Sequence, residues 1–246
     1  KNTMSDRHIV NKKFNSLLKD YREDIFNRVQ ESYGELQDAD KAKILRMNNF
    51  FCGLHFIVGM ATTAESTLSV WEDLIFQGQK VGAAASSGFQ SRGESGTVRL
   101  IRTVCKAVHE RGCQKAGKAG SFQAYLRTEY GISKVPLEQF IGNRFNIIFR
   151  NGAGVYFLKE ALNGFLNQVK DDNKLTKAVF SDLQVNQFLA GARALGLVSR
   201  LVTEPLWKVI EQKGHVSRLN CRYQQLVKKC ESFRSFSSLR CLFLAS

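Results

Sequence analysis

The chain has 246 residues, of which 43% are hydrophobic, and it carries a formal net charge of +14 at pH 7. This length and apolar content suffice for one large domain, or two small ones, with a hydrophobic core. The basic excess favours a polyanionic partner such as nucleic acid or an anionic membrane surface. No apolar run approaches the roughly 18 residues of a membrane-spanning helix, which argues against a membrane protein.

The six cysteines show no compact spacing, and a chain of this size needs no disulfides for stability. The start of the chain also lacks the charged and then apolar pattern of a secretory leader. We therefore expect reduced thiols in an intracellular protein. Because the chain begins with Lys1 rather than Met, we further expect a fragment of a longer protein.

An N-terminal helix is predicted over residues 9–29, because its apolar residues advance by three or four positions and form one stripe. That stripe consists of Ile9, Val10, Phe14, Leu17, Leu18, Tyr21, Ile25 and Val29. Ser5 or Asp6 would serve as its N-cap. A second helical stretch begins near Asp38 or Asp40 and continues to about residue 75, so that residues 1–77 form an N-terminal helical part.

The stretch GQKVGAAASSGFQSRGESG, residues 78–96, is rich in Gly and Ser and predicts a flexible loop at an internal boundary. Residues 97–232 form a second helical part, with helices near 98–112, 122–130, 144–166, 175–183, 185–211 and 219–227. Residues 233–246 are serine-rich without helical period and predict an irregular tail. The expected fold class is mainly α, a multi-helix bundle of seven to nine helices with little or no sheet.

The most apolar run is FFCGLHFIVGMA, residues 50–61. We predict a buried helix in which Cys52 and His55 share one face and His55 finds a hydrogen-bond partner. The alternative is a zinc site assembled with Cys105, His109 and Cys113. Since zinc ligands usually come in short knuckle loops, we favour buried thiols and a core histidine, and we expect no metal.

The sequence contains no complete motif for nucleophilic catalysis, zinc-protease activity or phosphate binding. There is no Gly-x-Ser-x-Gly elbow, no zinc-protease helix and no phosphate-binding loop. The glycines of GAAASSG and KAGKAG fit no phosphate fingerprint. We therefore expect no cofactor.

Basic residues are concentrated between positions 80 and 134, a stretch that contains ten Lys or Arg and only three Glu. Arg99, Arg102 and Lys106 advance by three and four and predict a basic stripe along one helix. Such a stripe could follow a phosphate backbone without reading sequence, and a solvated helix face is the other interpretation. The full set of candidate nucleic-acid-binding residues is Arg99, Arg102, Lys106, Lys115, Lys118 and Arg144.

Three short motifs together resemble the motif order of hAT-type transposases. They are MSDRHIVNKKFNSLL near the start, CGLH within the apolar run, and GNRFNIIF from Gly142. Cys52 and His55 resemble the Cys-x-x-His pair of that family. The Arg-Trp-Asn signature would correspond to Arg144, Phe145 and Asn146, preceded by Asn143, with Phe in place of Trp. The chain also resembles transposon-derived proteins of marine invertebrates in which NNFFCGLH and GNRFN recur.

This resemblance implies a ribonuclease-H-like enzyme that holds two metal ions with an Asp-Asp-Glu set. Asp6, with Asn11 after it, would match the second carboxylate, although a simple helix cap is an equal alternative. The first Asp would lie upstream of Lys1, and Glu160 or Glu204 match the final Glu by position only. The fragment would then resemble the helical insertion domain, and Mg²⁺ would matter only in an intact parent enzyme.

The sequence thus predicts a transposase-derived, catalytically inactive helical protein that binds DNA through basic helices, with a nuclear location. One alternative is a helical protein-interaction scaffold without nucleic-acid binding. A second is a fragment of an active metal-dependent DNA transposase or nuclease, in which Asp6 would be catalytic. The candidate partners are therefore DNA and other proteins.

Overall fold

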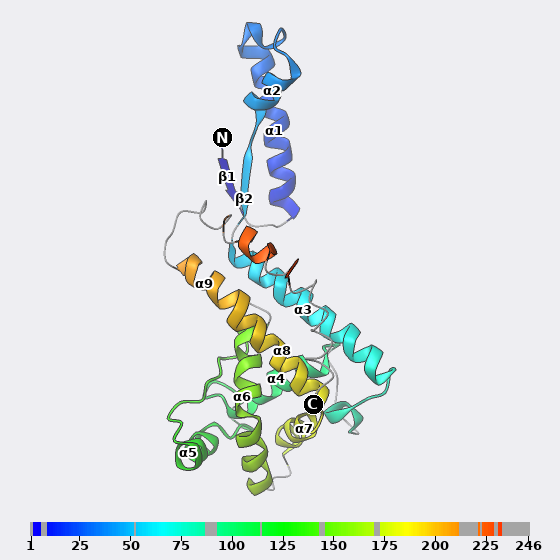
Figure 1. The fold of residues 1–246 in the computed structure, drawn as a ribbon, viewed down its shortest axis with the longest axis vertical. Helices are drawn as coiled ribbons and strands as arrows, with labels where there is room; N and C mark the ends of the chain where they lie inside the picture. Colours follow the sequence, from blue (N-terminus) through cyan, green and yellow to red (C-terminus); the bar gives the residue numbers. More distant parts are fainter. Residues whose placement is uncertain are drawn as a thin grey trace. The chain divides into compact units, whose positions relative to one another are not determined.

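The computed structural model describes residues 2–5, 9–51, 53–86, 93–113, 115–142, 146–169, 173–211, 221, 223–228 and 231–232 (Figure 1). These residues are mainly helical, which confirms the predicted fold class. The chain divides into two compact units, Lys1–Phe56 and Ile57–Ser246. No helix within the described ranges is long and apolar enough to cross a membrane.

The N-terminal unit contains two short strands, β1 (Asn2–Ser5) and β2 (Asn48–Phe51), which pair in parallel with Asn2 opposite Asn48 and Ser5 opposite Phe51. Parallel strands need a long crossover connection. Here α1 (Ile9–Val29), a 3₁₀ turn (Glu31–Tyr33) and α2 (Asp38–Leu45) supply it. Figure 1 shows α1 running beside the strand pair.

The core of this unit is small. Tyr33 and Leu45 are buried, and the Tyr33 ring stacks on Phe26 of α1 at 5.7 Å between centroids. Arg22 Nη2 donates to the carbonyl oxygen of Ile44 at 3.1 Å and so connects α1 to α2.

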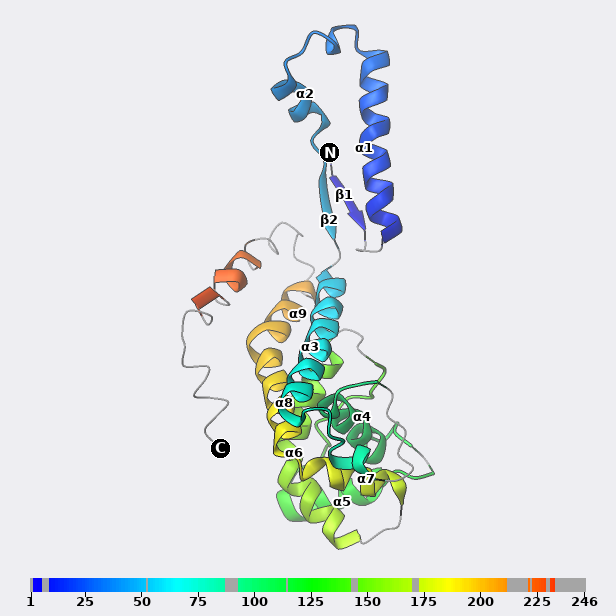
Figure 2. The same cartoon turned by 90° about the vertical axis from the view of Figure 1, so that its right-hand side faces the viewer.

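The second unit is an array of helices around one apolar core (Figure 2). In chain order its elements are most of α3 (Gly53–Phe76), η2 (Gly82–Ala85), α4 (Gly96–Val108), α5 (Ala119–Tyr130), α6 (Ile147–Val169), α7 (Lys174–Leu183), α8 (Asn186–Val198), the π-helical segment η3 (Ser199–Thr203) and α9 (Glu204–Glu211). The helix α4 is central, because every residue of it except Lys106 is buried.

The helices α6 and α8 pack closely against each other. Glycines make this possible, since a Cβ on Gly196 would lie 2.9 Å from the Cα of Ala153, and a Cβ on Gly152 would lie 2.8 Å from the Cβ of Leu195. Real Cβ atoms do not approach other atoms so closely, so larger residues at either position would force the two helices apart.

The run 50–61 is not the single buried helix predicted from sequence. Strand β2 ends at Phe51 and α3 begins at Gly53, while Cys52 lies outside the described residues. His55 is exposed, so its predicted burial is wrong. Ile57 and Ala61 form the buried face of α3, and a residue two positions before Ile57 points to the opposite side of a helix.

The predicted boundary at 78–96 lies inside the second unit, because both of its flanks pack into the same core. Phe76 meets Phe188 edge to face at 5.7 Å between centroids. Within the stretch, Ala83 is buried and its N–H donates to Asp182 Oδ1 at 2.8 Å. The division between the two units instead falls at Phe56. The predicted tail, 233–246, lies outside the described residues.

Candidate nucleic-acid interface

Arg99 and Arg102 do not form the exposed basic stripe that their spacing predicted. Arg99 is 4% exposed and Arg102 is 9% exposed. The guanidinium of Arg102 makes a bidentate contact with Glu94, with Nε 2.9 Å from Oε2. Helical spacing correctly placed the residues on one helix face, but α4 is enclosed on nearly every side. These two arginines are therefore structural and do not reach a polyanion from this position.

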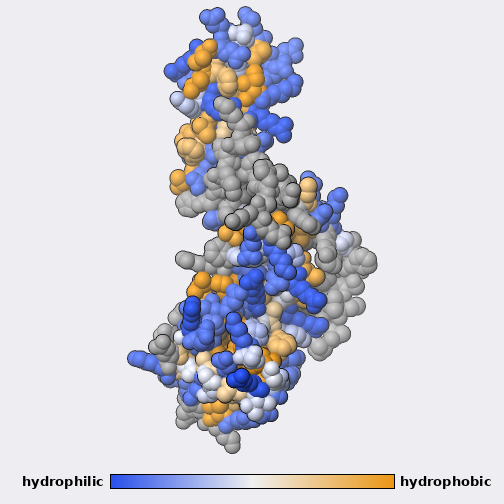
Figure 3. Space-filling model, turned by 90° about the vertical axis from the view of Figure 1, so that its left-hand side faces the viewer, coloured by the Kyte–Doolittle hydropathy of each residue, from blue (hydrophilic) through white to orange (hydrophobic). Residues whose placement is uncertain are grey.

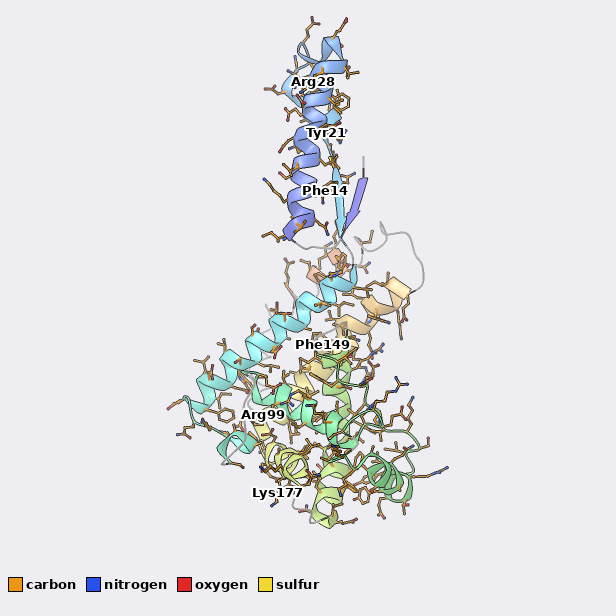
Figure 4. All side chains as sticks on the ribbon, turned by 180° about the vertical axis from the view of Figure 1, so that it is seen from behind. Phe14, Tyr21, Arg28, Arg99, Phe149 and Lys177 are labelled. Carbon is orange, nitrogen blue, oxygen red and sulfur yellow. The ribbon has the colours of Figure 1, made fainter. Side chains whose placement is uncertain are left out.

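Arg99 (Figure 4) connects three elements of the second unit. Its Nε and Nη2 donate to the two carboxylate oxygens of Asp182 on α7 at 2.9 and 2.8 Å. Its Nη2 also donates to the carbonyl oxygen of Val81, just before η2, at 3.2 Å. The guanidinium lies 5.3 Å from the ring centre of Phe188 on α8. Such bidentate pairs are rigid and satisfy both charges locally.

Lys106, Lys115 and Lys118, three of the four remaining predicted cations, lie in or next to the turn between α4 and α5, residues 109–118, which we call the α4–α5 turn. Lys115 is exposed and Lys118 is half-buried, and Lys106, also half-buried, lies in the last turn of α4. Arg111 is exposed in the same turn, although sequence reasoning counted it without singling it out. Glu110 is the one acidic residue between positions 106 and 118. The turn therefore presents a local excess of positive charge.

The α4–α5 turn is fixed by backbone hydrogen bonds. The N–H of Cys113 donates to the carbonyl oxygen of Lys106 at 2.8 Å, and that of Lys118 donates to Ala107 at 2.6 Å. Asn173 Nδ2 holds the carbonyl oxygen of Ala116 at 2.6 Å. A Cβ on Gly117 would overlap the carbonyl oxygen of Cys113, so only glycine fits there without a shift. The backbone geometry thus holds the lysines of the turn in place.

The same turn stabilises negative charge on a sulfur atom. Backbone hydrogen bonds from Ala116 and Lys115, with smaller contributions from Gly117 and the charge of Lys106, hold the pKa of the Cys113 thiol below its usual value. Cys105, eight residues earlier on α4, shows the reverse, because burial raises its pKa to about 12. Convergent backbone N–H groups can stabilise an anion, and in this turn the anion that they stabilise is the Cys113 thiolate.

We expect Cys113 to be alkylated by iodoacetamide severalfold faster in the folded chain than in urea at neutral pH. The thiolate is the reacting species, and a lowered pKa increases its fraction at every pH below the usual thiol value. The gain outweighs the modest loss of nucleophilicity that accompanies a lower pKa. Mass spectrometry of peptides labelled between pH 6 and 9 measures the rates.

Cys105 provides the internal control, because its buried thiol should stay unlabelled in the folded chain and react only after unfolding. A rate profile for Cys113 with the same midpoint pH folded and unfolded would contradict the backbone stabilisation described above.

Several predicted motif residues, namely Asp6, Cys52, Asn143, Arg144 and Phe145, lie outside the described residues. Asn146 is described and buried, and its Oδ1 accepts a hydrogen bond from Thr203 Oγ1 of the π-helical segment. The structure thus brings the end of the GNRFN motif against η3. This contact, 57 residues away in sequence, had no signal in the local pattern.

The two alternative candidates for the final Glu of the metal set, Glu160 and Glu204, lie in different surroundings, and Asp6 lies outside the described residues. Glu160 is exposed on α6, while Glu204 Oε1 lies 3.8 Å from Arg150 Nε. Within the part of the chain that the structure describes, no group of three or more His, Cys, Asp or Glu side chains could hold a metal ion. His109, half-buried after the end of α4, accepts the N–H of Arg111 on its Nδ1 at 3.0 Å.

Comparison with models of known protein families, with curated proteins and with solved structures finds no match to this chain.

Proposed function

We propose that the chain is a transposase-derived, catalytically inactive helical protein that binds DNA through the α4–α5 turn, without reading its sequence. The observation that carries the binding proposal is the composition and geometry of the turn. Four cations and one acid lie within residues 106–118, that is, the turn together with the end of α4, on a backbone fixed by hydrogen bonds. Phosphate oxygens are the anions that lysine and arginine contact in sequence-independent binding.

The distribution of charge supports the same surface. Residues 57–246 contain 26 Lys or Arg and 14 Asp or Glu, a net charge of +12, whereas residues 1–56 contain ten and eight, a net charge of +2. The two buried arginines of α4 are neutralised by Asp182 and Glu94. Most of the positive excess of the chain therefore belongs, by sequence, to the second unit, which contains the α4–α5 turn.

The proposed ancestry rests on motif order. Strand β1 ends at Ser5, directly before Asp6 in sequence, and α1 begins at Ile9. This strand, carboxylate and helix order is the context that a hAT-type transposase gives its second catalytic Asp. The proposal of inactivity rests on the single matched carboxylate, because two metal ions need a complete set of ligands.

A salt titration of DNA binding tests the proposal. We expect the chain to bind a duplex of unrelated sequence at low salt, with a log–log slope of about −2 to −4, as two to four phosphate contacts would give. Fluorescence anisotropy of a labelled duplex, with scrambled sequences as controls, measures both affinity and sequence independence. Absence of affinity for duplex and single-stranded DNA at low salt would refute the binding function.

A helical protein-interaction scaffold is the second candidate function, and a specific observation favours it. The helix α1 exposes several large apolar side chains on one face. Contiguous apolar patches on a protein surface mark interaction sites. A scaffold without DNA binding would form a defined protein complex through this face and show no nucleic-acid affinity in the titration above.

A further inference from the structure

The helix α1 carries its apolar residues on the outside of the N-terminal unit. Phe14 is 58% exposed, Leu17 52% and Tyr21 61%, and Ile25 is also exposed. Figure 4 labels Phe14 and Tyr21 on this helix, and Figure 3 shows apolar residues reaching the surface of the unit. Apolar residues at the two ends of α1 are also exposed, namely Ile9, Val10 and Val29. We call Phe14, Leu17, Tyr21 and Ile25 the α1 stripe.

The side of α1 that faces the interior of the unit lies about 100° around the helix from the stripe, and it mixes polar residues with Phe26, which stacks on Tyr33. Asn15 is buried there, and its Nδ2 has no hydrogen-bond partner among the described residues. Arg22 reaches from the same side to the carbonyl oxygen of Ile44 on α2. A helix normally turns its apolar stripe to the core and its polar face to water. In α1 the stripe is exposed instead, which indicates that it is an interface.

The charges along α1 identify the occupant. Residues 9–19 contain three lysines and no acidic residue, whereas residues 20–29 contain three acidic residues and two arginines. One edge of the stripe carries Lys13, Asp20 and Asp24. Lys13 stands four residues before Leu17, and the two aspartates stand three and seven residues after it, so all three lie beside Leu17 on the helix surface. The helix is therefore basic in its first half and more acidic in its second half.

We propose that the α1 stripe pairs antiparallel with the α1 stripe of a second copy of this chain. Such a pair, centred between Leu17 and Leu18, places Phe14 opposite Tyr21. It also places Lys13 of one copy between Asp20 and Asp24 of the other. A parallel pair would instead place the Lys13 edges of the two copies on opposite sides of the seam, so that Lys13 would face no carboxylate of the other copy. Complementary charge at the edge of an apolar seam selects partner and orientation.

The expected affinity is modest. The 21 residues of α1 span about 30 Å at 1.5 Å per residue, so one helix pair lies near the lower end of stable interface sizes. A reversible dimer with a dissociation constant of roughly micromolar order follows. This inference goes beyond DNA binding and uses no residue of the α4–α5 turn, so either can fail without the other.

Sedimentation equilibrium of the full chain tests the pairing. Between about 1 and 200 µM, a range that brackets micromolar affinity, the wild type should convert from monomer to dimer. The variant Leu17→Glu with Tyr21→Glu should stay monomeric across this range. The matched control is Val70→Glu with Leu74→Glu on α3, which changes two equally exposed apolar residues and should dimerise like the wild type.

Charge variants test the orientation. Lys13→Glu should weaken the dimer severalfold, because it sets a carboxylate against Asp20 and Asp24 of the other copy, and adding Asp24→Lys should restore it. In a parallel pair, Lys13 would face no carboxylate of the other copy, so Lys13→Glu would leave the affinity unchanged. A monomeric wild type, or a dimer that the stripe variant leaves intact, would overturn the pairing. An unchanged dimer with Lys13→Glu would overturn its antiparallel orientation. Circular dichroism of each variant verifies that the helices are retained.

Discussion

Replacing Asp182 with alanine is expected to lower the free energy of unfolding by about 3–5 kcal/mol, because it leaves the charge of Arg99 buried without a partner. Asp182 is fully buried. Its carboxylate accepts two hydrogen bonds from Arg99 and one from the N–H of Ala83. The substitution therefore also releases η2 from α7. Equilibrium unfolding in urea measures the loss.

Two variants separate this effect from the loss of any ion pair. Glu138→Ala removes the nearer of the two carboxylates beside Arg150. The Glu138 side chain is 44% exposed, and exposed pairs contribute at most about 1 kcal/mol. The double variant Arg99→Met with Asp182→Leu replaces both charges and should be more stable than Asp182→Ala, since no unpaired charge remains buried. If Asp182→Ala were as stable as Glu138→Ala, the structural role of the buried pair would be wrong.

Glu72→Ala is expected to cost about 2–4 kcal/mol, because it leaves backbone donors at the start of α4 buried and unpaired. Glu72, 7% exposed on α3, accepts hydrogen bonds from the N–H groups of Gly96 and Thr97, the latter at 2.9 Å. The hydroxyl of Thr97 donates to the same carboxylate at 2.7 Å. A negative charge at a helix N-terminus also complements the helix dipole.

The matched control is Asp73→Ala, which removes a carboxylate from the neighbouring, exposed position of α3. Surface substitutions of this kind usually change stability by no more than about 0.5 kcal/mol. Urea unfolding monitored by circular dichroism compares the two variants. Equal losses for Glu72→Ala and Asp73→Ala would contradict the cap that joins α3 to α4.

Helices with a clear apolar period were predictable from sequence. The stripe over 9–29 has the bounds of α1, and the helix predicted over 175–183 begins one residue late. The end of α5 followed from Gly131, whose φ of 67° lies in the left-handed region that glycine adopts at helix ends. Periodicity and punctuation are local properties of the chain, so the sequence contains them directly.

Burial of the basic residues on α4 was not predictable in this way. Spacing shows that Arg99, Arg102 and Lys106 share a helix face, but not what covers that face. Asp182, the partner of Arg99, lies 83 residues further along the chain, and no local pattern links the two. The parallel pairing of β1 and β2 escaped prediction for the same reason, since each strand has four residues and their partners are distant.

The orientation of α1 was likewise not predictable from the local sequence pattern. Its apolar period correctly predicted an amphipathic helix, but periodicity cannot tell an inward stripe from an outward one. The contacts of Arg22 and Phe26 with residues 33–44 decide the question, and they place the stripe on the surface. The α4–α5 turn was partly predictable, since Lys115 and Lys118 were among the candidate residues, while Arg111 emerged from its place in the folded turn.

DNA affinity of two charge-matched variants tests the proposed function most directly. One variant replaces Arg111, Lys115 and Lys118 with glutamine, and the other replaces exposed Lys80, Lys134 and Lys208, so each lowers the net charge by three. If the α4–α5 turn is the interface, the first variant should lose about 10- to 100-fold in affinity at low salt, and its log–log salt slope should become shallower by about two to three. The second should stay within about threefold of the wild type, since charges outside the contact act only through screened long-range attraction. Equal losses for both variants, or wild-type binding by the first, would contradict the assignment of the α4–α5 turn.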